Sequence, residues 1–178
     1  VGLTMSCFTE LRLLDPYELG LLPLISLIAV AKACDTGAYT FGRLFGRHKM
    51  SPIISPGKTI EGAVGGLLAA CAASYAVFWP YTVAFLSGHD EPKRFGGAWG
   101  WLAFGLLVGA AGMFGDLAES MLKRDAGVKD SSTWLPGLGG VLDILDSLLL
   151  SAPIALGWWL AATGQVSWSI LSSFGLWS

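Results

Sequence analysis

The charged residues of this chain gather in a few segments, and the uncharged stretches between them limit the fold more than any other feature. Seven charged residues lie in 32–61 and nine in 116–146, and the others lie in 1–18 and 90–94. The uncharged stretches are 19–31, 62–89, 95–115 and 147–178. A membrane-spanning helix needs about 20 apolar residues, so the second and third stretches are long enough to cross a bilayer.

The composition also points to a membrane protein. Charged residues make up 13% of the chain and apolar residues 53%, whereas an ordinary soluble domain has about 25% charged residues. A disordered chain would be poor in aromatic residues, which are 12% here. The net charge of −2 gives no basic surface of the kind that nucleic acid requires. We therefore expect an all-α, polytopic helical bundle in the lipid bilayer that binds no nucleic acid.

The first and last uncharged stretches leave alternatives open. Residues 19–31 are too short to span unless the helix continues through Lys32 and Asp35 into 36–45, and otherwise they form a half-buried helix. Residues 147–178 are long enough for one span and a tail. The chain also carries Trp residues near the ends of these stretches, which we interpret as interfacial anchors. They include Trp79, Trp99, Trp101, Trp158 and Trp159.

The two largest charged segments are predicted to lie on one face of the membrane. If 62–89 and 95–115 each cross once, 32–61 and 116–146 emerge on the same side. That side carries eight Lys and Arg residues, against two in the 90–94 loop, and the positive-inside rule makes it cytoplasmic. We expect a joint site at the cytoplasmic face of a multi-pass protein of the cell (inner) membrane.

Segment 116–146 contains two acidic groups at helical spacing. Spacings of three and four residues place four polar side chains on one helical face, namely Asp116, Glu119, Ser120 and Lys123. Asp143 and Asp146 are also three residues apart. Ionisable groups in membrane helices are by default functional candidates, and Mg²⁺ prefers oxygen ligands, often one or two carboxylates plus substrate phosphates. A magnesium site is one interpretation, and a cluster of salt bridges at helix ends is the other.

The Gly-Lys-Thr run at 57–59 invites comparison with a phosphate-binding loop. That motif needs a glycine five residues earlier and a preceding β-strand, but position 52 is proline and no strand is evident, so this interpretation is rejected. Pro56 after Ser55 is typical of a capped helix start. In the functional alternative, Lys58 contacts a phosphate or nucleotide at that helix N-terminus. His48 is expected to be a solvated loop residue.

Together these residues resemble the CDP-diacylglycerol synthases, also called phosphatidate cytidylyltransferases. That family's signature runs Ser-x-aliphatic-Lys-Arg, four residues, Lys-Asp, a spacer, Pro-x-His-Gly-Gly and Asp-Arg-x-Asp. The matching positions are Ser120, Lys123, Arg124, Lys129, Asp130, Pro136, Gly139, Gly140, Asp143 and Asp146. The runs at 35–39 and 55–62 also look like family motifs. Leu138 stands where the signature has His, and Ile144 where it has Arg.

The resemblance implies a nucleotidyl transfer in phospholipid biosynthesis, from CTP to phosphatidic acid, giving CDP-diacylglycerol and pyrophosphate. Such transfers depend on positioning and charge neutralisation, and metal ions clamp the reacting oxygens. The resemblance also suggests a homodimer. Because family members are usually longer, we expect residues 1–178 to be a single membrane domain that forms the C-terminal catalytic part of a longer chain.

The resemblance also implies roles for individual residues. The expected Mg²⁺ ligands are Asp116, Asp143 and Asp146. The expected catalytic residues are Lys123, Arg124, Asp143 and Asp146. The expected substrate-binding residues are Asp35, Ser55, Lys58, Thr59, Glu61, Ser120, Lys129 and Asp130.

Two other functions fit some of these features. A membrane cation transporter or channel would also place carboxylates in membrane helices, but it gives no reason for the Lys123-Arg124 pair or for Lys58. A CTP-dependent lipid kinase of related fold would transfer a phosphate and release CDP in place of pyrophosphate.

Overall fold

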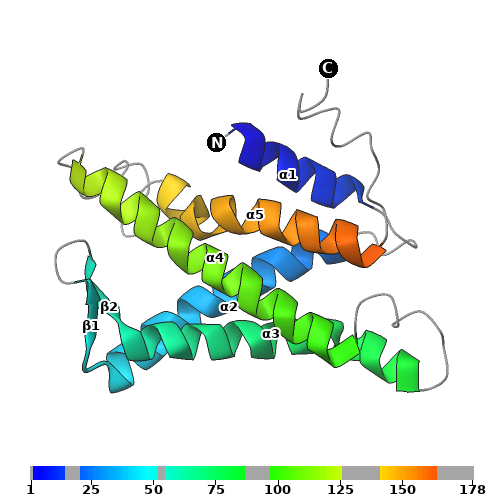
Figure 1. Ribbon diagram of the computed structural model, residues 1–178, viewed down its shortest axis with the longest axis horizontal. Helices are drawn as coiled ribbons and strands as arrows, with labels where there is room; N and C mark the ends of the chain where they lie inside the picture. The colour runs from blue at the N-terminus through cyan, green and yellow to red at the C-terminus, as the bar shows by residue number, and fades with distance from the viewer. Residues whose placement is uncertain (1, 15–20, 52–54, 87–96, 126–140, 164–178) are drawn as a thin grey trace.

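The fold is a bundle of helices with one small β-hairpin (Figure 1). The computed structural model describes residues 2–14, 21–51, 55–86, 97–125 and 141–163. The helices are α1 (Gly2–Leu13), α2 (Leu22–Phe45), α3 (Ile60–Leu86), α4 (Gly97–Asp125) and α5 (Val141–Thr163). The strands are β1 (Lys49–Ser51) and β2 (Ser55–Thr59), which pair antiparallel.

The described part of the chain has three helices long and apolar enough to cross a membrane, namely Leu22–Phe45, Ile60–Trp79 and Trp99–Asp125. A shorter apolar run, Ser147–Ala162, lies in α5. The expectation of an all-α polytopic membrane bundle is confirmed, apart from the hairpin. Helix α2 continues without a break through Lys32 and Asp35, so of the two alternatives for the first uncharged stretch the continuous helix is the one that forms.

Helices α2 and α3 approach each other closely because small residues line their contact. A Cβ atom added to Gly37 would lie 2.5 Å from Ala69 Cβ and 3.0 Å from the carbonyl oxygen of Gly65. Glycine at such positions lets the backbones of membrane helices come together. The close approach holds the C-terminal half of α2 beside the start of α3, where the hairpin also lies (Figure 1).

The core is built from aromatic side chains of α3, α4 and α5. The Phe78 ring stacks on Trp101 with centroids 5.7 Å apart, and it meets Phe104 edge-on. Trp101 and Trp159 are 1% and 0% exposed, so the interpretation of these two residues as interfacial anchors was wrong. Position near the end of an uncharged stretch does not say which side of the helix a residue occupies, and both side chains face other helices.

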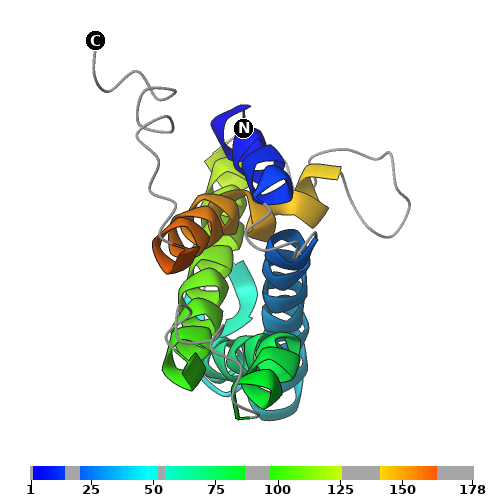
Figure 2. The ribbon, with the colours of Figure 1, turned by 90° about the vertical axis from the view of Figure 1, so that its right-hand side faces the viewer.

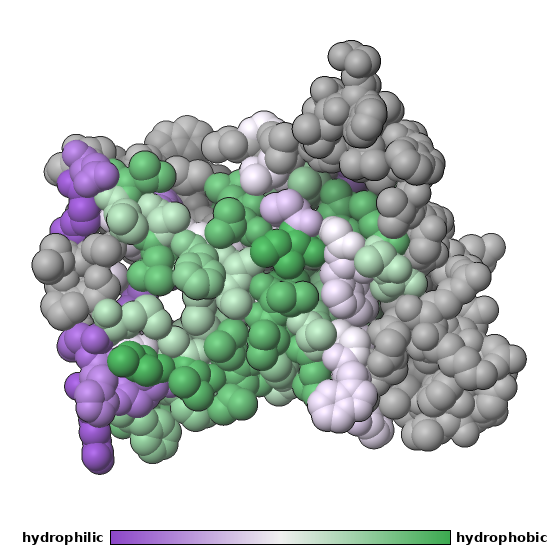
Figure 3. Space-filling model, viewed as in Figure 1, coloured by the Kyte–Doolittle hydropathy of each residue, from purple (hydrophilic) through white to green (hydrophobic). Residues whose placement is uncertain are grey.

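Polar residues collect at the end of the bundle that carries the hairpin. Figure 3 shows apolar residues across the middle of the molecule and hydrophilic residues gathered at this end. Figure 2 shows the hairpin between α2 and α4. The bundle therefore presents a polar end next to its apolar surface, and this is the end where the candidate site lies.

Candidate active site

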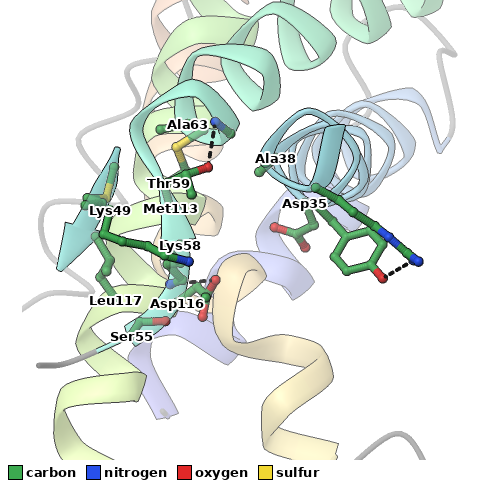
Figure 4. Close-up of a pocket in the computed structure, with 16 residues that line it drawn as sticks. Asp35, Ala38, Lys49, Ser55, Lys58, Thr59, Ala63, Met113, Asp116 and Leu117 are labelled. Atoms are coloured by element: carbon green, nitrogen blue, oxygen red, sulfur yellow. Dashed lines mark hydrogen bonds and ion pairs between the residues drawn. The ribbon is translucent and has the colours of Figure 1, made fainter. Parts of the chain in front are cut away.

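A cavity of about 720 Å³ opens at the polar end of the bundle. Its wall combines residues of α2, the hairpin, the first turn of α3, and α4 (Figure 4). Charged and hydroxyl side chains on this wall include Asp35, Arg43, Lys49, Ser55, Lys58 and Asp116. The two charged segments that topology placed on one membrane face therefore meet, as expected.

An ion pair between Lys58 and Asp116 joins the two segments. Lys58 Nζ lies 2.7 Å from Asp116 Oδ2, and the side chains are 26% and 37% exposed. Figure 4 shows the pair on the cavity wall, between β2 and α4. The Nζ atom is buried, and within the described residues it makes no hydrogen bond of good geometry. An ammonium group has three donors, so Lys58 retains donors for an anionic ligand.

The local structure around Lys58 differs from the expected helix start. Residues 55–59 form a strand, with Thr59 opposite Lys49 and Ser55 opposite Ser51. Helix α3 begins at Ile60, and Thr59 caps it by accepting a hydrogen bond from the backbone N–H of Gly62 (3.1 Å). The alternative of a cap at Ser55 and a helix start at Pro56 was therefore wrong. The expectation that this region has no strand was also wrong. The Gly-Lys-Thr run nevertheless lies inside the strand and not in a loop after it, so it does not form a phosphate-binding loop.

Glu61 holds the turn between α2 and β1 in place. Its carboxylate accepts hydrogen bonds from the backbone N–H groups of Arg47 (3.1 Å) and His48 (3.2 Å), and it lies 2.6 Å from His48 Nδ1. The His48 side chain is 76% exposed, as expected of a solvated loop residue. Glu61 lines a different pocket from Lys58. These contacts give Glu61 a structural role in the loop. Its predicted role in substrate binding stays a prediction.

Helix α4 carries the predicted polar face beyond the cavity. Asp116, Glu119, Ser120 and Lys123 lie on one continuous helix, as the spacing predicted. Lys123 Nζ pairs with Glu119 Oε1 at 3.0 Å. Lys123 follows Asp116 by seven residues, or about 10 Å along the helix axis, and the cavity wall does not include Ser120, Lys123 or Arg124. The roles predicted for these three residues are left as predictions.

Several predicted site residues lie outside the described residues. Lys129 and Asp130 belong to 126–140, which the structure does not describe. Asp143 and Asp146 lie in the first two turns of α5, but their side chains are outside the described part of the structure. Their expected roles are unchanged predictions.

The cavity also contains two cations that the sequence analysis did not single out. Arg43 lies in the last turn of α2, and its Nη1 donates a hydrogen bond to the Tyr39 hydroxyl (3.2 Å). Lys49 comes from β1. Both line the same cavity as Lys58. The spacing of four residues between Tyr39 and Arg43 was a usable signal, because it places both on one face of a helix. No comparable signal pointed to Lys49, since its place depends on the hairpin.

The oxygen donors of the cavity are of the kind that Mg²⁺ prefers. Asp35 and Asp116 contribute carboxylates to its wall. Among the residues whose side chains are described, no group of three or more His, Cys, Asp or Glu could hold a metal ion. Mg²⁺ often takes only one or two carboxylates together with substrate phosphates. The donor chemistry therefore fits magnesium.

Comparison with known proteins places these residues in a family context. The sequence model of the Cytidylyltransferase family matches residues 2–160. The chain is 41% identical over 139 residues to the phosphatidate cytidylyltransferase of Haemophilus influenzae, a match that covers 78% of this chain and 46% of the relative. It is 42% identical over 130 residues to that of Chlamydia muridarum, covering 73% and 40%. It is 38% identical over 154 residues to the phosphatidate cytidylyltransferase of Staphylococcus aureus, a match that covers 86% of this chain and 53% of the relative. The chain spans about half the length of these curated relatives.

Proposed function

Because this chain belongs to the cytidylyltransferase family, we propose that it transfers the cytidylyl group of CTP to phosphatidic acid. An oxygen of the lipid phosphate forms a bond to the α-phosphorus of CTP. The bond from that phosphorus to the oxygen bridging to the β-phosphate breaks, and pyrophosphate leaves. The products are CDP-diacylglycerol and pyrophosphate.

The observation that carries this proposal is the Lys58–Asp116 ion pair, 2.7 Å long, in a cavity that also receives Arg43 and Lys49. A triphosphate and a lipid phosphate bring several negative charges together, and the transfer needs those charges positioned and neutralised. Asp116 fixes the Lys58 ammonium before the substrates arrive. Charge arranged in advance in this way stabilises a transition state without a cost of reorganisation.

The position of the cavity suits a reaction between one soluble substrate and one lipid. It opens at the hydrophilic end of the bundle, next to the apolar band across its middle (Figure 3). We propose that this end faces the cytoplasm at the cell (inner) membrane, because its segments carry most of the Lys and Arg residues. The homodimer suggested by the family resemblance is part of the proposal, and chemical cross-linking in bilayers tests it.

Magnesium is also part of the proposal. Asp116, Asp143 and Asp146 would hold the ion, which when bound neutralises and clamps phosphate oxygens. Asp143→Asn and Asp146→Asn are each expected to abolish turnover while the protein still inserts into the membrane. Near-normal turnover in either variant would contradict the assignment of that residue.

The test is incorporation of radiolabelled CTP into lipid by the full-length protein, in liposomes containing phosphatidic acid, with and without Mg²⁺. The expected result is magnesium-dependent labelled CDP-diacylglycerol together with pyrophosphate. Release of CDP in place of pyrophosphate would overturn the proposal in favour of a lipid kinase. The absence of both labelled lipid and released CDP, with protein correctly inserted, would reject both reactions.

A further inference from the structure

A second group of polar side chains joins α2 to α5. Lys32 Nζ lies 3.0 Å from Asp35 Oδ2 and donates a hydrogen bond to Ser147 Oγ at 3.1 Å. The Ser147 hydroxyl in turn donates to Asp35 Oδ2 at 2.9 Å. We call these three residues the α2–α5 triad, because each contacts the other two and together they connect α2 to α5. Asp35 and Ser147 are 112 residues apart in the sequence.

The triad is an expensive way to join two membrane helices. Lys32 lies near the middle of α2, a candidate membrane span, and ionisable side chains in such segments are costly and usually functional. The Lys32 and Asp35 side chains are 39% and 36% exposed, and an apolar pair would avoid the cost of placing two charges in a membrane span. Packing of α2 against α5 therefore does not account for a lysine and an aspartate at this place.

Asp35 is the triad residue that lines the cavity of the described residues. Asp35 lines the cavity, whereas Lys32 and Ser147 do not. Lys32 precedes Asp35 by three residues, so it lies about 4.5 Å further from the polar end along α2. Both contacts to the carboxylate use Oδ2, so neither takes Oδ1. Figure 4 shows the Asp35 carboxylate extending from α2 towards the side where Lys58 and Asp116 lie.

Ser147 also stands next to the acidic turns of α5. Asp146 is its neighbour in sequence, and Asp143 precedes it by four residues, about one helical turn. The Ser147 side chain is fully buried, so its hydroxyl is fixed by its surroundings. A bond from Ser147 to Asp35 therefore sets the beginning of α5 at a defined position relative to the cavity wall.

We propose that Lys32 and Ser147 are positioning residues, which hold the Asp35 carboxylate towards the cavity and hold the start of α5 in register with it. Lys32 supplies the positive charge that balances the carboxylate within the membrane. Ser147 links that carboxylate to the helix that carries Asp143 and Asp146. This inference rests on the proposed cytidylyl transfer, because that reaction is what the positioned groups serve.

The chain offers a matched pair of variants for the test. Ser147→Ala removes the triad hydroxyl, and Ser151→Ala removes a hydroxyl one turn further along α5. Ser151 Oγ lies 3.2 Å from the carbonyl oxygen of Val108 and 2.5 Å from the backbone carbonyl oxygen of Ser147, so it contacts the Ser147 backbone but not the hydroxyl that belongs to the triad. Both side chains are 0% exposed, so each variant loses the same atom from a fully packed place in the same helix.

The measurements are kcat/KM for CTP in the liposome assay and the melting temperature of the full-length protein. Ser147→Ala is expected to lower kcat/KM about tenfold or more, as loss of a partner that orients a site residue does. Ser151→Ala is expected to stay within about twofold of the wild type, with a similar melting temperature. Lys32→Arg should retain much more activity than Lys32→Met, since it keeps the charge.

A double-mutant cycle separates positioning from general damage. If Ser147 acts through Asp35, the variant Asp35→Asn with Ser147→Ala has the same kcat/KM as Asp35→Asn alone. Equal activities of Ser147→Ala and Ser151→Ala would overturn the inference, and so would losses that multiply in the double variant. If the wild type itself made no labelled lipid, the proposed function would fail. Additive changes in melting temperature around the same cycle would then reject the triad as a coupled unit.

Discussion

The two aspartates on the cavity wall are each paired with a lysine, but the pairs are built in opposite ways. Lys58 lies on β2 and itself lines the cavity, and Asp116 reaches Lys58 from α4. In the Lys32–Asp35 pair the aspartate lines the cavity, and its lysine lies three residues back on the same helix. The first pair therefore presents a cation to a ligand, and the second presents a carboxylate.

This difference follows from where each lysine is anchored. Lys58 comes from a short strand at the polar end, where an ammonium group can meet a soluble phosphate. Lys32 comes from the middle of a membrane span, where its charge has to be balanced by nearby groups. The roles proposed for the two pairs therefore differ: ligand binding at the polar end, and alignment of Asp35 further along α2. Substitutions in each pair test this distinction.

The largest effect is expected for Lys58→Met. It removes a cation that is fixed at the cavity, so kcat/KM for CTP is expected to fall about 10³-fold, or about 4 kcal/mol of transition-state stabilisation. The measurement is the initial rate of labelled CTP incorporation over a range of CTP concentrations. Lys58→Arg is the control, because it retains the charge. A loss in Lys58→Met no larger than that in Lys32→Met would remove the distinction between the two pairs.

A smaller loss of about 10²-fold in kcat/KM is expected for Asp116→Asn, since it leaves Lys58 in place but releases it from its partner. The variant also tests whether Asp116 does more than hold the lysine. If it holds magnesium as well, the Mg²⁺ concentration that gives half-maximal activity rises. An unchanged magnesium requirement would limit Asp116 to the ion pair.

The third prediction concerns the contact between α2 and α3, which holds α2 beside the start of α3. Gly37→Val adds a side chain where even a Cβ would lie 2.5 Å from Ala69 Cβ and 3.0 Å from the Gly65 carbonyl oxygen. Separating α2 from α3 is expected to cost about 1–3 kcal/mol of stability, measured by thermal unfolding in detergent. Gly57→Ala is the control, because an added Cβ there meets nothing within 4 Å. Equal melting temperatures for the two variants would mean that α2 and α3 tolerate separation.

Charge spacing alone predicted much of this arrangement. The uncharged stretches marked the helices, and the expectation that 62–89 and 95–115 each cross once brought Asp116 and Lys58 to one side of the membrane. The hairpin could not be foreseen, because its strands have three and five residues and Pro56 and Gly57 are poor strand formers. The bond between Asp35 and Ser147 was also hidden, since spacing along one helix says nothing about which other helix packs against it.

The smallest effect is expected for Glu61→Gln, which tests the one predicted substrate-binding residue that the structure ties into a loop. Its carboxylate is already engaged by two backbone N–H groups and His48, and the side chain is partly exposed, so the expected change in kcat/KM is within about fivefold. His48→Ala is the matched variant, and it should behave alike if both residues only shape the turn. A rise of about tenfold or more in KM for CTP in Glu61→Gln alone would show that this carboxylate contacts the nucleotide. The nucleotide site would then extend from Lys58 to the pocket at the turn between α2 and β1, which Glu61 lines.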